Sequence, residues 1–228
     1  MDFDQYSFKP YYGSSHVWAM KYLHKVPLQS RVLDVGPGSG FCGCVLRNRG
    51  LTELEAIETD SNRIKLLSPL YRRIERNINA YKGELFDLIL LLDVLEHMTQ
   101  PLVFFKEVLR LLAPGALLVV SVPNVAHWSV RLPLLFGFFE YYDRGILDRT
   151  HYQFFTRRRF KHLLAGGNLI VEEITSSISP AELVLPKAFW DNQVFHFLSR
   201  ARQLGANILP GLFAYQHLAA LRKPPAPT

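Results

Sequence analysis

The chain has 228 residues, of which 49% are hydrophobic, 20% charged and 13% aromatic, and its formal net charge is +6. This length suits one large domain with a real core, and the apolar fraction excludes a disordered chain. The longest apolar runs, such as Leu132 to Phe139, are shorter than the roughly 18 residues needed to cross a bilayer. Because Asp2 and Asp4 precede any apolar stretch, the start is unlike a signal peptide, and we expect a cytoplasmic protein.

The positive charge is too dispersed to indicate a nucleic-acid-binding protein. The densest basic cluster, residues 157–161, is shorter than a nucleic-acid-binding arm. Residues 181–228 hold five Lys and Arg against two Asp and Glu, which suggests at most weak peripheral contact with an anionic membrane surface. Cys42 and Cys44 lack the second Cys or His pair that a zinc site needs, so we expect two buried thiols and no metal centre.

The first half of the chain alternates between strand and helix patterns. After an aromatic-rich N-terminal helical cap, residues 1–29, with a helix at Ser14–Lys25, the predicted elements are a strand at Arg31–Val35, a helix at Phe41–Asn48, a strand at Leu54–Thr59, a helix at Ser61–Ile74, a strand at Asp87–Leu92, a helix at Pro101–Leu112 and a strand at Ala116–Val122. The continuous apolar strands are typical of a parallel sheet buried on both faces. This alternation predicts an open α/β sheet.

The second half departs from this alternation. Residues 123–156 are rich in aromatic side chains and show no clean periodicity, and segments of this length in a compact domain are usually functional. The predicted elements that follow are a helix at Thr156–Ala165, a strand at Leu169–Ile174, an amphipathic helical segment at 181–209 and a final strand at Leu212–Leu221. We expect the 181–209 segment to pack on the sheet, with exposure to a membrane surface as the alternative.

A glycine turn follows the first strand, in the sequence Asp34-Val35-Gly36-Pro37-Gly38-Ser39-Gly40. Glycine has no Cβ and accepts a positive φ, so a ligand can lie directly on such a backbone. In open α/β sheets, ligands bind at the carboxyl ends of the strands. A dinucleotide motif also matches at Gly38, Gly40 and Gly43, but it begins three residues after the strand, where the tight turn would be misplaced.

Two acidic residues favour a cationic cofactor over a dinucleotide at this turn. Asp34 stands at the end of the first strand and Glu58 at the end of the second, with Asp60 two residues later. A carboxylate at Asp34 would repel a pyrophosphate but suits the sulfonium and ammonium of S-adenosylmethionine. Glu58 is placed to accept hydrogen bonds from ribose hydroxyls. A hydride-transfer enzyme using a nicotinamide cofactor stays open as the less favoured alternative.

At this point the sequence resembles the class I S-adenosylmethionine-dependent methyltransferases. The resemblance covers roughly residues 29–174 and rests on four stretches, namely Val32–Gly40, Ala56–Asp60, Phe86–His97 and Leu111–Asn124. It implies a Rossmann-like, doubly wound and mostly parallel seven-stranded sheet with an antiparallel last strand. The cofactor-binding residues that it implies are Asp34, Gly36, Gly38, Gly40, Glu58, Thr59, Asp60, Asp93 and Val94.

The sequence departs from the family pattern at the position beside the adenine. The family's acid–hydrophobe pair beside the adenine is absent from the short interval Ile74–Phe86, and Asn79 is the candidate there.

We expect a single domain over residues 1–228, with a cofactor-binding half at 30–122, a substrate insert at 123–156 and a C-terminal half at 157–228. The insert follows strand five, and the helical segment lies between strands six and seven.

The methyl acceptor is less clearly indicated than the cofactor. Methylation of a hydroxyl benefits from a base with a pKa near neutral, and His151, His127 and His97, in that order of preference, lie where the carboxyl edge of the sheet is expected. The insert, from Pro123–Arg131 to Gly145–His151 and Phe154–Thr156, resembles that of a methyltransferase group associated with sugar and cell-surface glycan biosynthesis. We therefore expect O-methylation of a sugar or glycan-precursor hydroxyl.

Other functions stay open at this stage. The acceptor could instead be a phenol, a quinol or a carboxylate, and the chain could be a cofactor-binding module that docks on a partner. Nucleic-acid methylation is disfavoured, because Asp93-Val94-Leu95-Glu96-His97 stands where base-modifying enzymes of this fold carry their Pro-Pro-aromatic or Pro-Cys stretch.

Overall fold

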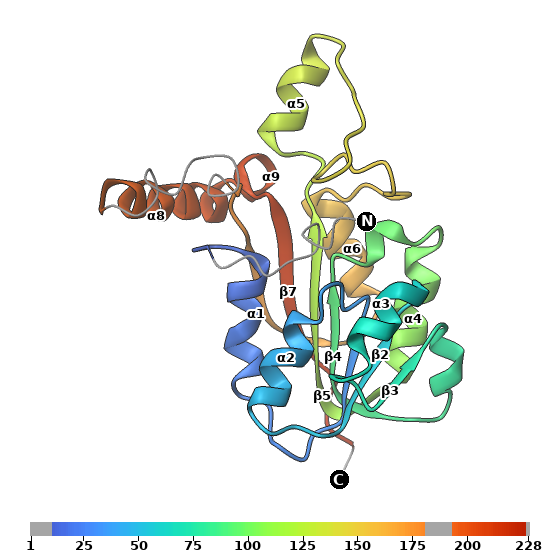
Figure 1. Ribbon diagram of the computed structural model, residues 1–228. Helices are drawn as coiled ribbons and strands as arrows, with labels where there is room; N and C mark the ends of the chain where they lie inside the picture. The colour runs from blue at the N-terminus through green and yellow to red at the C-terminus, as the bar shows by residue number, and fades with distance from the viewer. Residues whose placement is uncertain (1–10, 181–192, 227–228) are drawn as a thin grey trace.

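The structure is a computed structural model that describes residues 11–180 and 193–226 (Figure 1). Seven strands form one sheet in the order β3-β2-β1-β4-β5-β7-β6. The strands are β1 (Val32–Val35), β2 (Leu54–Ile57), β3 (Arg73–Glu75), β4 (Phe86–Leu92), β5 (Leu112–Pro123), β6 (Ile170–Ser176) and β7 (Gln216–Arg222). Only β7 runs antiparallel to both of its neighbours, β5 and β6. The expected α/β sheet, doubly wound and mostly parallel with an antiparallel last strand, is confirmed.

Helices connect the strands. The α-helices are α1 (Ser15–Leu23), α2 (Phe41–Asn48), α3 (Ser61–Leu67), α4 (Pro101–Arg110), α5 (Trp128–Leu135), α6 (Arg157–Ala165), α8 (Gln193–Ile208) and α9 (Pro210–Phe213), with 3₁₀ turns η2 (Ile78–Tyr81) and η3 (Leu95–His97). Side chains that accept from backbone N–H groups define several helix starts, for example Ser14 before α1 and Thr156 before α6. Pro101 occupies the first turn of α4, where its missing N–H costs nothing.

The core consists of two apolar layers, one on each face of the sheet. Strand β4 shows how the sequence builds both, because Leu88 and Leu90 enter one layer while Ile89 and Leu91 enter the other. The first layer lies under α1 and α2, with Leu23 and Leu46 among its members. The second lies under α4 and α6 and includes Phe105 and Phe160. A strand buried on both faces needs apolar residues at every position, which explains the continuous run.

Several predicted boundaries are wrong. Strand β5 begins at Leu112, four residues before the predicted Ala116, and β2 ends at Ile57 rather than Thr59. The helix predicted over Ser61–Ile74 ends at Leu67, because Pro69 has no N–H to continue the helix ladder. The residues that follow form β3, which pairs in parallel with β2. The last strand begins at Gln216 rather than Leu212, since Pro210–Phe213 form the short helix α9.

Two burial expectations also need correction. Cys42 is buried, as expected, but Cys44 is exposed on α2. Helix α8 does not pack broadly on the sheet, because only Ser199 and Ala206 among its residues are buried. It exposes large apolar side chains, including Phe197 at 70%. Among the described residues, no helix is both long and apolar enough to span a membrane. Weak peripheral membrane contact stays a prediction, and residues 181–192 of the helical segment lie outside the described residues.

The core assignment makes a stability prediction on α4. Phe105 is fully buried in the second layer, so Phe105→Ala should lower the free energy of unfolding by about 3–5 kcal/mol. Val103 on the same helix is 53% exposed, so Val103→Ala should change that energy by less than about 0.5 kcal/mol. Urea unfolding of both variants checks the difference, and equal costs would contradict the layer assignment.

Candidate cofactor and acceptor site

The candidate site lies at the carboxyl ends of β1, β2, β4 and β5. The sheet order reverses between β1 and β4, so the loops after these two strands diverge to opposite sides and leave a crevice between them. The glycine turn follows β1, Glu58 follows β2, and Asp93 follows β4. The structure therefore brings these predicted residues to one edge of the sheet (Figure 1).

The three predicted glycines all adopt left-handed backbone conformations. Their φ values are 63° at Gly36, 57° at Gly38 and 79° at Gly40, a region that residues with a Cβ rarely adopt. Space is also restricted, because a Cβ on Gly36 would lie 3.2 Å from Cγ2 of Val94. A side chain at Gly36 or Gly40 would therefore strain the turn, whereas glycine leaves the backbone accessible to a ligand.

Asp34 is buried and hydrogen-bonded beneath this turn. Its exposure is 4%, and its Oδ2 accepts a 2.6 Å hydrogen bond from the hydroxyl of Tyr71, which follows α3. Burial raises the pKa of Asp34 to about 6, the Tyr71 hydrogen bond opposes this rise, and the charge of Glu58 adds to it. The two acids therefore influence each other, so this edge carries concentrated negative charge when both are ionised. Sequence reasoning did not identify Tyr71.

Glu58 is held by the backbone that follows it. Its Oε1 accepts from the N–H groups of Thr59 and Asp60 at 2.7 and 2.9 Å, and its Oε2 lies 3.9 Å from the Arg63 guanidinium. The side chain is 5% exposed. Because Oε1 anchors the carboxylate, Oε2 is oriented by protein contacts before any ligand arrives.

The neighbouring predicted residues have mainly local contacts. Asp60 caps α3 by accepting from the N–H groups of Asn62 and Arg63, and these hydrogen bonds lower its pKa. Thr59 is exposed, and its carbonyl accepts from Arg76. Asn79 lies exposed in η2, after β3. This position follows a third strand, as in the resemblance, although the sequence pattern did not reveal that strand.

Asp93, the residue directly after β4, has an unusual backbone conformation. Its φ of 57° makes it one of two non-glycine residues with a positive φ among the described residues. Its Oδ1 accepts from the Ser121 hydroxyl at 2.6 Å, and both carboxylate oxygens lie 2.6 Å from Nε2 of Gln216. Val94, the next residue, is buried against the glycine turn. Sequence reasoning missed Gln216, because no local motif marks a glutamine at the start of a strand.

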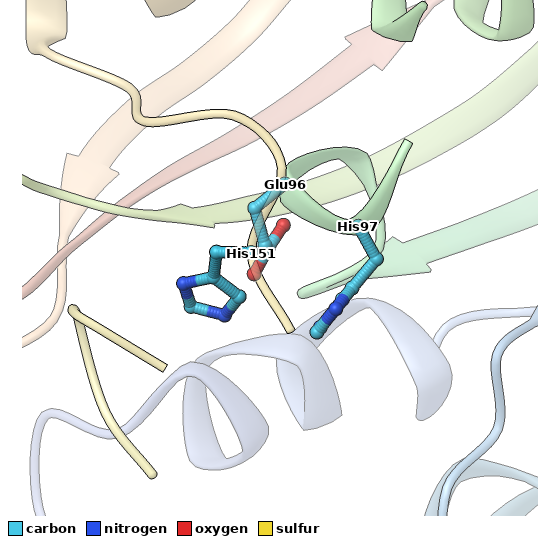
Figure 2. Close-up of side chains that lie close together, drawn as sticks. All are labelled: Glu96, His97 and His151. Atoms are coloured by element: carbon cyan, nitrogen blue, oxygen red, sulfur yellow. The ribbon is translucent and has the colours of Figure 1, made fainter. Parts of the chain in front are cut away.

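His97 and His151 lie together with Glu96 (Figure 2). The two imidazole rings are 4.8 Å apart in an edge arrangement, although 54 residues separate them in the chain. The insert is attached here, because the N–H groups of Tyr152 and Gln153 both donate to the Glu96 carbonyl. The structure therefore brings together two of the three predicted histidines.

This group also has the ligand types of a metal site. The side-chain ligand atoms of Glu96, His97 and His151 lie within 4.8 Å of one another. A carboxylate and two imidazoles are a ligand set that divalent metal ions accept. The expectation of no metal centre therefore stays a prediction.

The contacts of His151 fix its hydrogen positions. Its Nδ1 lies 3.0 Å from the carbonyl oxygen of Ile146, which can only accept, so Nδ1 carries the hydrogen. Nε2 of the neutral ring then carries the lone pair. Burial lowers the pKa of His151 below its ordinary value, and the neighbouring His97 adds to this decrease. Asp148 does not orient His151 through its carboxylate, which instead accepts from the N–H and hydroxyl of Thr150.

His127 occupies a different environment from the other two histidines. It is 1% exposed, and it caps α5 by accepting at Nδ1 from the N–H of Ser129. Its Nε2 lies 3.0 Å from the Ser179 hydroxyl. Burial lowers its pKa to about 4. Because protein groups engage both ring nitrogens, this geometry favours a structural role for His127.

Aromatic rings connect His151 to the exposed part of the insert. The ring centroid of His151 lies 6.5 Å from that of Phe154. The Phe154 centroid in turn lies 6.2 Å from that of Phe139 and 6.4 Å from that of Tyr141. Helix α5 and the chain that follows it project beyond the carboxyl edge of the sheet (Figure 1) and expose Phe136 and Phe138 at 75% and 64%. The insert therefore places an aromatic cluster beside His151.

Comparisons with known proteins agree with this geometry. Residues 18–174 match the family described as "Methyltransferase domain". A ubiquinone biosynthesis O-methyltransferase of Bartonella tribocorum is 28% identical over 161 residues, which are 66% of this chain and 64% of that protein. Another, of Parvibaculum lavamentivorans, is 31% identical over 103 residues, which are 41% of this chain and 40% of that protein. The chain thus matches less than two thirds of the length of these curated relatives.

The fold has close structural neighbours. The crystal structure of a SAM-dependent methyltransferase from Archaeoglobus fulgidus superposes with a TM-score of 0.63 at 15% sequence identity. The match covers 92% of this chain and 95% of that protein. At this identity the likeness concerns the fold.

The burial of Asp34 predicts how stability depends on pH. Because its folded pKa, about 6, lies above its ordinary value of 3.8, the native state holds a proton more tightly than the unfolded state. The stability that Asp34 contributes is therefore present below about pH 4 and lost as the pH rises through 6, by about 3 kcal/mol in total. Urea unfolding from pH 4 to 8 should show this loss in the wild type relative to Asp34→Asn.

A second variant tests the cause. Tyr71→Phe removes the hydrogen bond that lowers the pKa of Asp34, so the loss should extend to a higher pH than in the wild type. Parallel stability profiles for the wild type and Asp34→Asn would contradict the raised pKa.

Proposed function

Because the chain belongs to the methyltransferase-domain family, we propose that it methylates a hydroxyl oxygen of an aromatic, quinol-like acceptor. The cofactor is S-adenosylmethionine, which supplies an activated methyl group on its sulfonium. The observation that supports hydroxyl chemistry best is His151, whose Nδ1 is held by the Ile146 carbonyl and whose ring centroid lies 6.5 Å from that of Phe154 in the insert.

The residues at the sheet edge fit this cofactor. Two acids, Asp34 and Glu58, face a ligand that carries positive charge, and the glycine turn keeps Cβ atoms away from it. We propose that Oε2 of Glu58 accepts from the ribose hydroxyls, since its Oε1 is already anchored. Asn79 is the proposed adenine contact, and the Asp93–Val94 turn is proposed to line the methionine end.

His151 is the proposed general base. A base must be unprotonated to accept the hydroxyl proton, and the lowered pKa of His151 keeps its ring neutral at pH 7. The Ile146 carbonyl fixes the tautomer in which Nε2 is the acceptor. His97 lies beside it and is held at Nδ1 by Thr150. We therefore assign proton acceptance to His151 and a positioning role to His97.

The acceptor class follows from the insert and the relatives. Phe154 lies beside the proposed base and contacts Phe139 and Tyr141, and the faces and edges of these rings suit an aromatic acceptor. The two curated relatives are named for O-methylation in ubiquinone biosynthesis. A sugar hydroxyl is the second candidate, favoured by the polar residues Asp148, Arg149 and Thr150 beside the same histidine.

A methyl-transfer assay tests the acceptor and the base together. With radiolabelled S-adenosylmethionine, catechols and hydroquinones should be methylated, whereas nucleotide sugars should not. His151→Ala should lower turnover on the order of 10²–10⁴-fold, the usual contribution of a general base. The affinity for S-adenosylhomocysteine, measured by calorimetry, should change little, because His151 lies outside the proposed cofactor contacts.

The matched control is His24→Ala, which removes an exposed histidine at the end of α1 and should leave turnover unchanged. Methylation of sugars alone would replace the quinol acceptor by the sugar acceptor. Full activity of His151→Ala on every acceptor would remove His151 as the base.

A further inference from the structure

Gln216 joins the last strand of the sheet to the turn after β4. Its Nε2 lies 2.6 Å from each carboxylate oxygen of Asp93, although the two residues are 123 positions apart in the sequence. Gln216 is 4% exposed, so these charge-assisted hydrogen bonds are shielded from water. The only hydrogens available to Asp93 from this side chain are those of the amide nitrogen, which fixes the orientation of the amide.

A second residue fixes the other end of that amide. The Ser177 hydroxyl donates to Oε1 of Gln216 at 2.9 Å and accepts from the Gln216 N–H at 3.0 Å. Ser121 on β5 adds a further contact to Asp93, donating to Oδ1 and accepting from the Asp93 N–H. Asp93 is therefore held by β5 and β7 together.

These contacts compensate for an unfavourable backbone conformation. A left-handed φ is unfavourable for an L-residue, and it persists where surrounding contacts determine it. At Asp93, this conformation bends the chain out of β4, so that Val94 reaches the Gly36 turn and η3 begins directly after it. The position of Val94, Glu96 and His97 therefore depends on how Asp93 is held.

The two residues directly before β7 also reach the insert. Asn124 donates through Nδ2 to the carbonyl of Ala214 at 2.8 Å, and the ring of Tyr215 lies 5.8 Å from that of His127. Ala214 and Tyr215 thus contact the insert, and Gln216, the next residue, contacts Asp93. A displacement of this short segment would affect both sides of the site.

We propose that Gln216 is a positioning residue that holds the Asp93 turn in its cofactor-binding conformation. The inference rests on the proposed function only in taking the Asp93–Val94 turn as part of the cofactor site. Gln216 acts through Asp93 and touches neither the cofactor nor the acceptor. Its carboxylate partner serves as the anchor of the turn, and the backbone that follows forms the binding surface.

Exchange of the two side chains tests this proposal. Gln216→Glu places two carboxylates against each other, so the affinity for S-adenosylhomocysteine should fall about 10- to 100-fold, the scale of a lost hydrogen bond to a charged group. The double variant Asp93→Asn with Gln216→Glu restores one carboxylate and one amide, and it should recover most of the affinity. Calorimetry measures both constants without any acceptor.

A neutral variant and a control complete the design. Gln216→Met has similar length but no donor, so it should weaken binding in the same direction while urea unfolding shows the protein folded. Gln29→Ala removes an exposed glutamine that precedes β1, at the opposite end of that strand from the glycine turn, and should bind like the wild type.

The outcomes separate the proposal from the proposed function. Wild-type affinity of folded Gln216→Met, or a double variant no better than Gln216→Glu alone, would overturn the positioning role. Weakened and then restored binding supports it even if no quinol is methylated, because the readout is cofactor affinity and not turnover.

Discussion

The chain must leave the carboxyl ends of β1 and β4 in a left-handed backbone conformation, and the rest of the site depends on this constraint. After β1 the constraint is met by glycines, which adopt it without cost at Gly36, Gly38 and Gly40. After β4 it is met by Asp93, whose carboxylate is fixed by Ser121 and Gln216. The first turn leaves its own backbone accessible to a ligand, and the second presents the backbone that follows Asp93. Together they border the crevice where the sheet order reverses.

The electrostatics of this crevice follow from the same arrangement. Asp34 is buried under the turn and Glu58 is anchored by backbone N–H groups, so both carboxylates are positioned before a ligand binds. Burying such charges is costly unless they are paired, and the raised pKa of Asp34 reflects that cost. A cationic ligand offsets this penalty, whereas a pyrophosphate adds to it. The carboxylates of the folded protein therefore favour a sulfonium cofactor before any ligand binds.

The sequence predicted the elements whose local pattern is strong and missed those set by long-range contacts. Strand β4 contains the apolar run Leu88–Leu92, and this run predicted a buried strand. Strand β3 is three half-buried residues, Arg73–Glu75, with no apolar run to mark it. Its position depends on ion pairs such as Arg72 with the buried Glu55 of β2, which no sequence window contains. Helix α8 was expected to pack on the sheet, yet amphipathic spacing alone does not show which surface covers a helix.

The candidate site likewise combines residues that a local pattern predicts with residues that long-range contacts place. Glycines and acids at strand ends are local signals, and the structure places them at one edge as expected. Gln216 and Tyr71 carry no local signal, because their importance lies in the distant carboxylates that they contact. The approach of His97 and His151 to each other also depends on how the insert docks on η3. Such contacts arise only when the whole sheet is assembled.

We infer that the carboxylate edge selects a cationic nucleoside cofactor. Calorimetric titration of the wild-type protein with S-adenosylmethionine and, separately, with NADH tests it most directly. We expect one saturable site for S-adenosylmethionine, with lower affinity in Glu58→Gln, and no saturable binding of NADH. Tight NADH binding that S-adenosylmethionine does not displace would contradict it.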